Sequence, residues 1–369
     1  MARRARNIYK RKDGRYEGRY IKERDMHGKA KYGSVYAHSY VEAKEKLEIM
    51  QAQPENDRVS SKKLVVETVK AYIEKIKHTI KPSTYDVYRR YCNNHIKPYF
   101  EGIKCSELSV KIIQEFINKK HKNNNNKNGL SASTIQSVFI FLKNCLKESV
   151  PSSIFQVTLP KRAKHKPKVL SLSEQKRLEA AAIKSGDINH IGIILCLYTG
   201  IRIGELCGLM WDDIDFDEKQ LNIRRTCQRI NTYSQKANEP KTKIAYLSPK
   251  SKSSNRSIPI PKYLLELLKI YKSKSTDEFV LMQNKKAIEP RNMRYKFKKL
   301  LSLASIRNVN FHTTRHTFSV RALENNFDIK TLSEILGHSS PVITLATYAH
   351  TLDEHKRKSM ESLASVYSL

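Results

Sequence analysis

Residues 311–316 read FHTTRH, and this short segment decides the fold of the last part of the chain. His312 and Arg315 stand three residues apart, so in a helix both side chains project from one face. Histidines at such spacings also occur in metal sites, but the positive charge of Arg315 would repel a cation. The segment therefore predicts a helix whose functional face binds an anion.

Further segments on both sides of this one carry strongly polar residues next to apolar ones. They are TGIRIGEL at 199–206, LGHSS at 336–340 and TYAH at 347–350. Arg202 follows an apolar run and a glycine, with Glu205 one helical turn later. His338 and Tyr348 lie in the other two segments. Taken singly, each residue fits an ordinary surface or core position, so the functional signal is their occurrence in this order.

Together, these residues could break a phosphodiester bond. The guanidiniums of Arg202 and Arg315 offer planar forks that hold both non-bridging oxygens of one phosphate and stabilise the charge that develops on them. The Tyr348 hydroxyl, with an ordinary pKa of about 10, is a weak nucleophile at neutral pH. Its attack needs a cationic pocket and a proton acceptor such as His312. His338 could donate a hydrogen bond to a phosphate oxygen in the transition state.

In this order, the segments resemble the signature R…K…H-x-x-R…H…Y of the tyrosine recombinases, or phage-type integrases, over residues 171–350. The resemblance implies that Tyr348 forms a 3′-phosphotyrosine with DNA and that a homotetramer exchanges strands through a Holliday junction. Because the phosphotyrosyl ester keeps the bond energy for rejoining, no ATP is needed. We expect no metal or other cofactor, since the arginines, a lysine and a histidine supply the charge that Mg²⁺ supplies elsewhere.

The resemblance also assigns a lysine that donates a proton to the departing sugar oxygen. Residues 248–260 read SPKSKSSNRSIPI, and alignment with the family pattern K-S/T-x-x-R-x-I-P selects Lys252 in a hairpin. Lys250 stays open as the alternative, because spacing alone cannot fix a lysine in a loop. Glu205 is expected to support Arg202 or a neighbour without reacting itself.

One spacing departs from the family. His338 and Tyr348 are ten residues apart, where many relatives have nine. One extra residue in a helix would rotate the following side chains by about 100°. We therefore expect either a loop at Pro341 or a displaced Tyr348. The competing nucleophile, Tyr367, lies in the C-terminal tail, which the resemblance places on the neighbouring protomer.

Length, charge and composition bound the remaining possibilities. The 369 residues are too many for one core, at roughly 100–200 residues per domain. Lys and Arg number 69 against 36 Asp and Glu, and the net charge of +33 predicts a large polyanionic partner. A mean hydropathy of −0.58 and the absence of a long apolar run or signal peptide favour DNA over a membrane and predict a cytoplasmic location. The six cysteines lack paired spacing, so we expect reduced core residues and no metal site.

Residues 1–58 are predicted to form a three-stranded sheet followed by a helix. Alternating, Tyr-rich segments are separated by turn signals such as Asp13-Gly14, and a Ser39-x-x-Glu42 capping box opens the helix. We interpret this block as a DNA-binding domain with one face of its sheet in the major groove, and the resemblance to integrases implies that it binds arm-type sites. Its candidate contacts are Arg11, Arg15, Arg19 and Lys31.

The rest of the chain is predicted to be mostly helical. Apolar residues at spacings of three and four over 62–160 predict a small helical domain. The resemblance to integrases implies that it is a SAM-like core-binding domain. A Pro-bounded basic linker covers 161–170, and the catalytic domain with a C-terminal tail covers 171–369. Candidate DNA contacts in the linker are Lys161, Arg162 and Lys164. The catalytic domain should be mixed α+β, so the fold class is mostly α with small β elements.

The organisation favours a site-specific DNA integrase of a mobile genetic element, a conjugative transposon or a temperate phage, that acts on core and arm attachment sites. An excisionase and a DNA-bending protein stay open as further partners. One alternative is a Xer-like chromosome resolvase, which lacks an N-terminal basic sheet. A second is a type IB topoisomerase-like enzyme, which has no need for two DNA-binding blocks. A third is a catalytically silent DNA-binding protein, which has no need for Tyr348 and Lys252.

Overall fold

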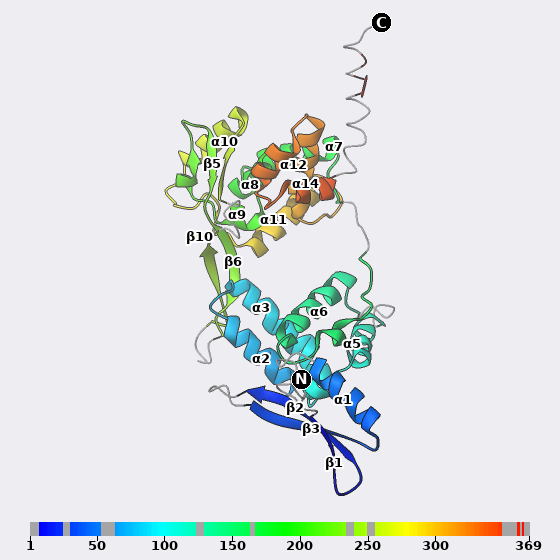
Figure 1. The fold of residues 1–369 in the computed structure, drawn as a ribbon. Helices are drawn as coiled ribbons and strands as arrows, with labels where there is room; N and C mark the ends of the chain where they lie inside the picture. The colour runs from blue at the N-terminus through cyan, green and yellow to red at the C-terminus, as the bar shows by residue number, and fades with distance from the viewer. Residues whose placement is uncertain are drawn as a thin grey trace. The chain divides into compact units, whose positions relative to one another are not determined.

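The computed structural model describes residues 7–24, 30–52, 63–122, 129–162, 167–233, 240–248 and 255–348, together with residues 360, 361 and 364. Contacts divide the chain into two units, 1–164 and 165–369 (Figure 1). The first unit contains a sheet and a group of helices, and the second contains helices and further strands. Among the described residues, no helix has both the length and the apolar composition needed to cross a membrane.

The first unit begins with an antiparallel three-stranded sheet in the order β1-β2-β3. Its strands are β1 (Ile8–Lys10), β2 (Tyr16–Arg24) and β3 (Ala30–Ala37). Gly14 in the first turn has a φ of 83°, a left-handed conformation that glycine adopts without steric cost. Helix α1 (Tyr40–Ala52) follows Ser39, whose hydroxyl accepts a hydrogen bond from the Glu42 N–H at 3.1 Å. The predicted sheet and helix are confirmed.

Helix α1 packs on one face of this sheet, where Ala43 and Leu47 are buried. Strand residues alternate between faces, so the face away from α1 carries every second residue. Glu17 pairs with Tyr36, and Arg19 pairs with Ser34, across β2 and β3 on that outer face. The sheet therefore has one apolar side under a helix and one side of arginine, tyrosine and glutamate.

The helical part of the first unit has a single apolar core. Its elements are α2 (Val65–Ile76), α3 (Pro82–Tyr91), a π-helical turn η2 (Cys92–Ile96), α4 (Lys97–Phe100), α5 (Val110–Lys122) and α6 (Ala132–Leu146), with short 3₁₀ turns η3 (Cys105–Glu107) and η5 (Ser152–Phe155). Val69, Ile73, Phe100, Phe116 and Leu142 are all buried in that core. Buried residues lie four apart in α2, at Val69 and Ile73, and three and four apart in α6, at Ile135, Val138 and Leu142, which is the pattern that predicted a helical domain.

The second unit is mixed α and β. Its helices are α7 (Leu172–Ser185), α8 (Ile188–Thr199), α9 (Ile203–Cys207), α10 (Lys262–Lys272), α11 (Pro290–Leu303), α12 (His312–Glu324), α13 (Ile329–Leu336) and α14 (Pro341–Tyr348). Its strands are β4 (Ile214–Asp215), β5 (Gln220–Ile223), β6 (Thr226–Asn231), β7 (Thr242–Leu247), β8 (Arg256–Pro259), β9 (Met282–Gln283) and β10 (Lys286–Ala287). They form a sheet in the order β4-β5-β8 and two hairpins, β6-β7 and β9-β10.

Helix α8 forms the centre of this unit, and α7, α11 and α12 all contact it. Nearly every residue of α8 is buried, including Ile193, Ile194 and Leu195. Helix α7 begins with a capping box, in which Ser171 and Glu174 exchange both hydrogen bonds. All six cysteines are unpaired and buried, as the sequence predicted.

Some expected elements differ in detail. The sequence did not single out α11 as a helix, although Met293, Phe297 and Leu300 repeat at helical spacing and are buried. Ser83 and Asp86 have the spacing of a helix N-cap, but α3 begins earlier, at Pro82 after Lys81. Proline at the first helical position has a fixed φ that suits the helix and no N–H to leave unpaired, so it sets this start.

Candidate active site

The turn between α8 and α9 positions Arg202. Gly200 ends α8 with a φ of 65°, and a Cβ there would lie 2.5 Å from the Phe318 ring, so the position requires glycine. Arg202 is the N-cap of α9, and its backbone N–H donates to Glu205 Oε2 at 2.9 Å. The Arg202 guanidinium donates to Glu205 Oε1 at 2.8 Å and to the Gly337 carbonyl at 3.2 Å. The Arg202 side chain is thus fixed by Glu205 on its own helix and by Gly337, 135 residues further along the chain.

Glu205 also holds a second arginine. The Arg256 guanidinium, from β8, donates to Glu205 Oε2 at 3.0 Å and to the Ile335 carbonyl. Burial raises the pKa of Glu205, but the neighbouring charges of Arg256 and Arg202 outweigh it, so the pKa lies below its usual range. Glu205 is therefore a carboxylate that pairs two arginines. Arg256 was quoted in the family pattern, but its role as a partner of Glu205 was not predicted.

Arg315 lies on α12 and is only 2% exposed. Its Nη1 donates to the Gly200 carbonyl at 2.8 Å, and its Nη2 donates to the Leu336 carbonyl at 2.7 Å. Burial, followed by repulsion from Arg202, lowers the pKa of Arg315 to about 9. The side chain thus remains charged at neutral pH, although it is buried beside another cation.

The two predicted phosphate-binding arginines converge on the C-terminal end of α13. Arg315 bonds the Leu336 carbonyl, and Arg202 bonds the carbonyl of the next residue, Gly337. The last carbonyls of a helix have no partner within it and carry partial negative charge, so they suit guanidinium donors. Each guanidinium has five N–H donors, so donors remain available for an anion. The structure brings Arg202 and Arg315 together, as phosphate binding requires.

Histidines surround the buried Arg315 guanidinium. Burial and the charges of Arg315 and Arg202 lower the pKa values of His312 and His338, that of His338 to about 4. Burial, His312 and Arg315 lower the pKa of His316 to about 4 as well. The three imidazoles are therefore neutral at pH 7. The Nδ1 atom of His338 lies 2.7 Å from the Thr344 hydroxyl, so α14 fixes the orientation of its ring.

Tyr348 is the last residue of α14 and is 2% exposed. Its ring belongs to a buried apolar cluster with Val320, Leu332 and Leu336, and its hydroxyl lies 2.7 Å from Nδ1 of His316. Burial raises the pKa of this hydroxyl above its ordinary value. The sequence suggested His312 as the proton acceptor and did not single out His316.

The extra residue between His338 and Tyr348 lies in a break between helices. Gly337 ends α13 with a φ of 64°, and α14 begins at Pro341. Because the two residues are not on one continuous helix, the extra residue does not rotate Tyr348 away from the site. The expected loop before Pro341 is confirmed.

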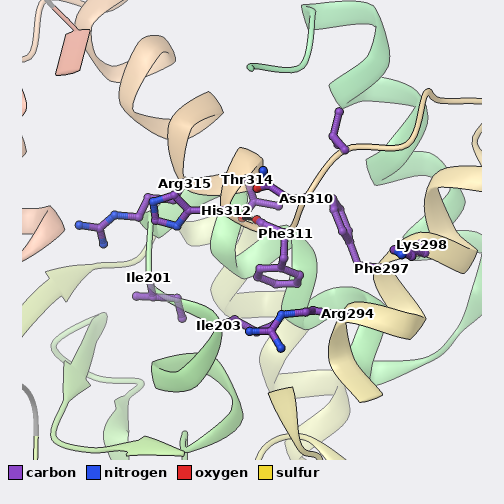
Figure 2. A pocket seen from close by; sticks show the side chains of 11 residues that line it. Ile201, Ile203, Arg294, Phe297, Lys298, Asn310, Phe311, His312, Thr314 and Arg315 are labelled. Atoms are coloured by element: carbon purple, nitrogen blue, oxygen red, sulfur yellow. Dashed lines mark hydrogen bonds between the residues drawn. The ribbon is translucent and has the colours of Figure 1, made fainter. Parts of the chain in front are cut away.

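A cavity of about 410 Å³ opens beside His312 and Arg315. Figure 2 shows that α11 also contributes Arg294 and Lys298 to its lining. Both are exposed cations. In the sequence they are two of many basic residues, so only the fold identifies them as neighbours of the predicted site.

Some predicted site residues fall outside the described part of the chain. These are Lys252, its alternative Lys250, the linker residue Lys164 and the tail residue Tyr367. Lys31 lies in β3, but its side chain is likewise not described. Lys161 and Arg162 are exposed. Their proposed roles in proton transfer and DNA contact stay predictions.

The predicted N-terminal contacts lie around a buried carboxylate. Glu17 is 3% exposed and accepts hydrogen bonds from Ser34 at 2.7 Å, Arg11 at 2.7 Å and Arg19 at 3.3 Å. The bonds from Ser34 and Arg11 contribute to lowering the pKa of Glu17 to about 2. The guanidiniums of Arg11 and Arg15 lie over the Tyr36 ring, and that of Arg19 lies over the Tyr9 ring. Aromatic stacking thus holds these arginines on the outer face, where Glu17 also binds Arg11 and Arg19 and Asp13 binds Arg15 at 2.8 Å.

Comparisons with known proteins agree with this geometry. Residues 168–355 match the model of the phage integrase family, and residues 65–121 match the N-terminal SAM-like domain of phage integrases. The XerC-like tyrosine recombinase of Caldanaerobacter subterraneus subsp. tengcongensis is 27% identical over 321 residues, which cover 80% of this chain and 81% of the relative.

Two solved structures share the fold at lower identity. A fragment of the Tn1549 transposon integrase in complex with transposon right-end DNA has a TM-score of 0.67 and 21% identity, covering 82% of this chain and 100% of that one. A lambda integrase tetramer bound to a Holliday junction has a TM-score of 0.55 and 16% identity, covering 92% of this chain and 97% of that one. The helical part with an N-terminal sheet and the mixed α and β unit therefore form a known architecture.

Proposed function

Since the chain belongs to the phage integrase family of tyrosine recombinases, enzymes that break and rejoin DNA, we propose that it is the site-specific integrase of a mobile genetic element. In this proposal, Tyr348 attacks a DNA phosphate and forms a covalent 3′-phosphotyrosine. The observation that carries it is the convergence of Arg202 and Arg315 on successive carbonyls, Leu336 and Gly337, with Tyr348 on the next helix.

Each residue of the site has a role in this reaction. Arg202 and Arg315 hold the non-bridging oxygens and stabilise the charge of the pentacoordinate transition state. Glu205 and Arg256 position Arg202, and His338 donates a hydrogen bond to a phosphate oxygen. Lys252, or Lys250, gives a proton to the 5′-oxygen as it leaves. The ester bond to Tyr348 is as rich in energy as the bond that broke, so the free 5′-hydroxyl can reverse the reaction.

The N-terminal sheet favours a mobile-element integrase over a Xer-like resolvase. Its outer face holds Arg11, Arg15 and Arg19 beside tyrosines, which suits binding to a second, arm-type DNA site. The fold shared with a transposon integrase supports the same assignment. The curated relative with a Xer-type name supports the chemistry equally well, so the arm-binding face is the feature that separates the two functions.

We extend the proposal to assembly and partners. The related lambda integrase structure is a tetramer on a Holliday junction, and we propose a homotetramer on core-site DNA here. The C-terminal tail after Tyr348 would dock on the neighbouring protomer. An excisionase, a DNA-bending protein and a cytoplasmic location belong to the same proposal.

Covalent attachment to DNA tests the enzyme function directly. The full chain would select its own site from a pool of random duplexes, and a nicked copy of that site would then be incubated with protein without metal or ATP. We expect a protein–DNA band on a denaturing gel that is lost in Tyr348→Phe. Tyr295→Phe, an exposed tyrosine on α11, and Tyr367→Phe serve as controls that keep the band. A silent DNA-binding protein would select DNA and give no band, which would refute the proposal.

A further inference from the structure

The hydroxyl of Tyr348 has one basic group within hydrogen-bond distance in the described part of the chain. That group is the imidazole of His316, whose Nδ1 lies 2.7 Å from Tyr348 Oη. The two rings also meet edge to face, with centroids 5.8 Å apart and planes at 65°. A nucleophilic hydroxyl and a base in direct hydrogen-bond contact are the recognised arrangement for activating a weak nucleophile.

Among the described residues, the other groups around Tyr348 are not bases that could accept its proton. The side chain is 2% exposed, so bulk water does not reach the hydroxyl freely. Ser319, one turn after His316 on α12, is also a hydrogen-bond partner of the Tyr348 hydroxyl, but it donates its own hydroxyl to the Arg315 carbonyl at 2.9 Å and is not basic. Arg315 is already a cation. Val320, Leu332 and Leu336 belong to the same buried apolar cluster as the ring and offer no polar group.

We propose that His316 is a catalytic residue, the base that removes the proton of the Tyr348 hydroxyl as that oxygen attacks the DNA phosphate. The inference rests on the proposed function, in which Tyr348 is the nucleophile. The proton moves from Tyr348 Oη to His316 Nδ1 while the bond between Oη and phosphorus forms. The bond from phosphorus to the 5′-oxygen breaks, and this oxygen takes a proton from Lys252 or Lys250. On rejoining, each proton returns along the same path.

His312 lines the cavity beside Arg315, whereas His316 contacts Tyr348, so the two histidines have different roles. The His312 ring meets the His316 ring edge to face, with centroids 4.6 Å apart, and it lines the cavity beside Arg315 (Figure 2). Residues four apart on a helix lie one above the other, so α12 places one imidazole toward the cavity and the next toward Tyr348. We therefore assign His312 to the phosphate and His316 to the nucleophile.

The charges around His316 link its basicity to the presence of DNA. His316 is neutral in the free protein because burial, His312 and Arg315 lower its pKa to about 4. A phosphate bound to Arg315 offsets the nearby positive charge and so raises the pKa of His316. Charged and titratable groups from several elements lie around His316. They are Arg202 and Glu205 at α9, Arg256 on β8, His312 and Arg315 on α12, His338 after α13, and Tyr348 on α14. The base therefore becomes stronger when its substrate is bound.

His316→Asn is the first test, because an amide keeps a hydrogen-bonding group near the position of Nδ1 without being a base. In single-turnover cleavage of the nicked duplex, we expect the rate of covalent attachment to fall by about 100-fold or more, with unchanged DNA binding. His312→Asn is the matched variant one turn away and should also slow cleavage, through the phosphate.

A fluorinated tyrosine at position 348 separates base catalysis from a structural role. Its hydroxyl ionises near neutral pH and needs little help from a base. We expect this replacement to restore most of the rate lost in His316→Asn and little of the rate lost in His312→Asn. The rate of His316→Asn with fluorinated tyrosine should also rise with pH along the ionisation of the new phenol.

The outcomes separate the inference from the proposed function. If the wild-type chain forms the Tyr348 adduct and His316→Asn reacts at the same rate, the base assignment is wrong and the recombinase function stands. A slow His316→Asn that fluorination fails to restore also overturns it, because His316 would then only support the fold. If the wild-type chain forms no Tyr348 adduct, the proposed function fails first, and the inference fails with it.

Discussion

Glu205 and Arg256 form a buried ion pair, with Arg256 Nη2 3.0 Å from Glu205 Oε2 and side-chain exposures of 6% and 4%. The two residues lie on α9 and β8, so the pair joins the helical and strand parts of the second unit. Arg256 also donates to the Ile335 carbonyl near the end of α13. Through Arg256, the Glu205 carboxylate connects α9, which positions Arg202, to the end of α13. The carbonyls of Leu336 and Gly337 there accept hydrogen bonds from Arg315 and Arg202.

Glu205→Ala should therefore destabilise the second unit. Removing one partner of a buried ion pair leaves the other charge uncompensated, at a cost of about 3–5 kcal/mol. The chain has a single tryptophan, Trp211, buried in this unit, so its fluorescence in urea reports the free energy of unfolding there. Glu266→Ala removes an exposed pair with Lys269 and should cost less than about 1 kcal/mol. Equal effects of the two variants would contradict the structural role of Glu205.

Two glycines at helix ends allow a second prediction, about Gly200. Gly186 ends α7 with a φ of 63° and has open space around it, whereas Gly200 ends α8 with a φ of 65° against the Phe318 ring. Gly186→Ala should cost only the backbone strain of an L-residue, about 1–2 kcal/mol. Gly200→Ala should cost about 1–3 kcal/mol more because the added methyl group overpacks the core.

Gly200→Ala should also slow DNA cleavage, since the Gly200 carbonyl accepts a hydrogen bond from Arg315. Urea unfolding followed by Trp211 fluorescence gives the stability difference, and single-turnover adduct formation gives the rate. Gly186→Ala should leave the rate unchanged. If both variants lose the same stability and the same activity, the close contact at Gly200 has no consequence.

The sequence predicted the parts of the site that local patterns specify. The segment around His312 and Arg315 has helical spacing, and α12 begins at His312. The turn at Gly200 is a helix stop followed by Arg202, and the structure has both features. These predictions succeed because glycines, caps and residue spacings act over a few residues.

The contacts that could not be predicted join residues far apart in the chain. Glu205 pairs with Arg256 across 51 residues, and His316 contacts Tyr348 across 32. In the sequence, His316 is one more basic residue beside Arg315, and nothing nearby shows that α14 returns to it. Helix α11 was missed because its apolar residues are interspersed with lysines and arginines, although its buried face is regular.

The low pKa of His338 predicts a loss of stability in acid. Its value is about 4, below the ordinary 6.5, so between these pH values the unfolded chain binds more protons than the folded one. The contribution of His338 to the free energy of unfolding is therefore complete above the ordinary pKa of 6.5. It is lost as the pH falls toward the folded-state pKa of about 4. With allowance for partial exposure, His338 alone should account for about 2 kcal/mol between about pH 7 and about pH 4.5.

His338→Asn isolates this contribution. The drop in unfolding free energy between the two pH values should be about 2 kcal/mol smaller in the variant than in the wild-type chain, because asparagine does not titrate. Urea unfolding with Trp211 fluorescence at both pH values measures the difference. An identical drop in both proteins would mean that His338 titrates normally in the folded chain.

The outer face of the N-terminal sheet supports a last prediction, about salt. If Arg11 and Arg19 contact DNA phosphates, each releases about one condensed counterion on binding. Arg11→Gln combined with Arg19→Gln should weaken binding of the full chain to arm-type DNA and lower the slope of log affinity against log salt by about 2. Lys44→Gln combined with Lys46→Gln removes the same charge from α1, on the opposite side of the sheet, and should change the slope much less. Titrations at several salt concentrations compare the pairs. Equal slopes would show that net charge alone matters and that the arginine face makes no specific contact.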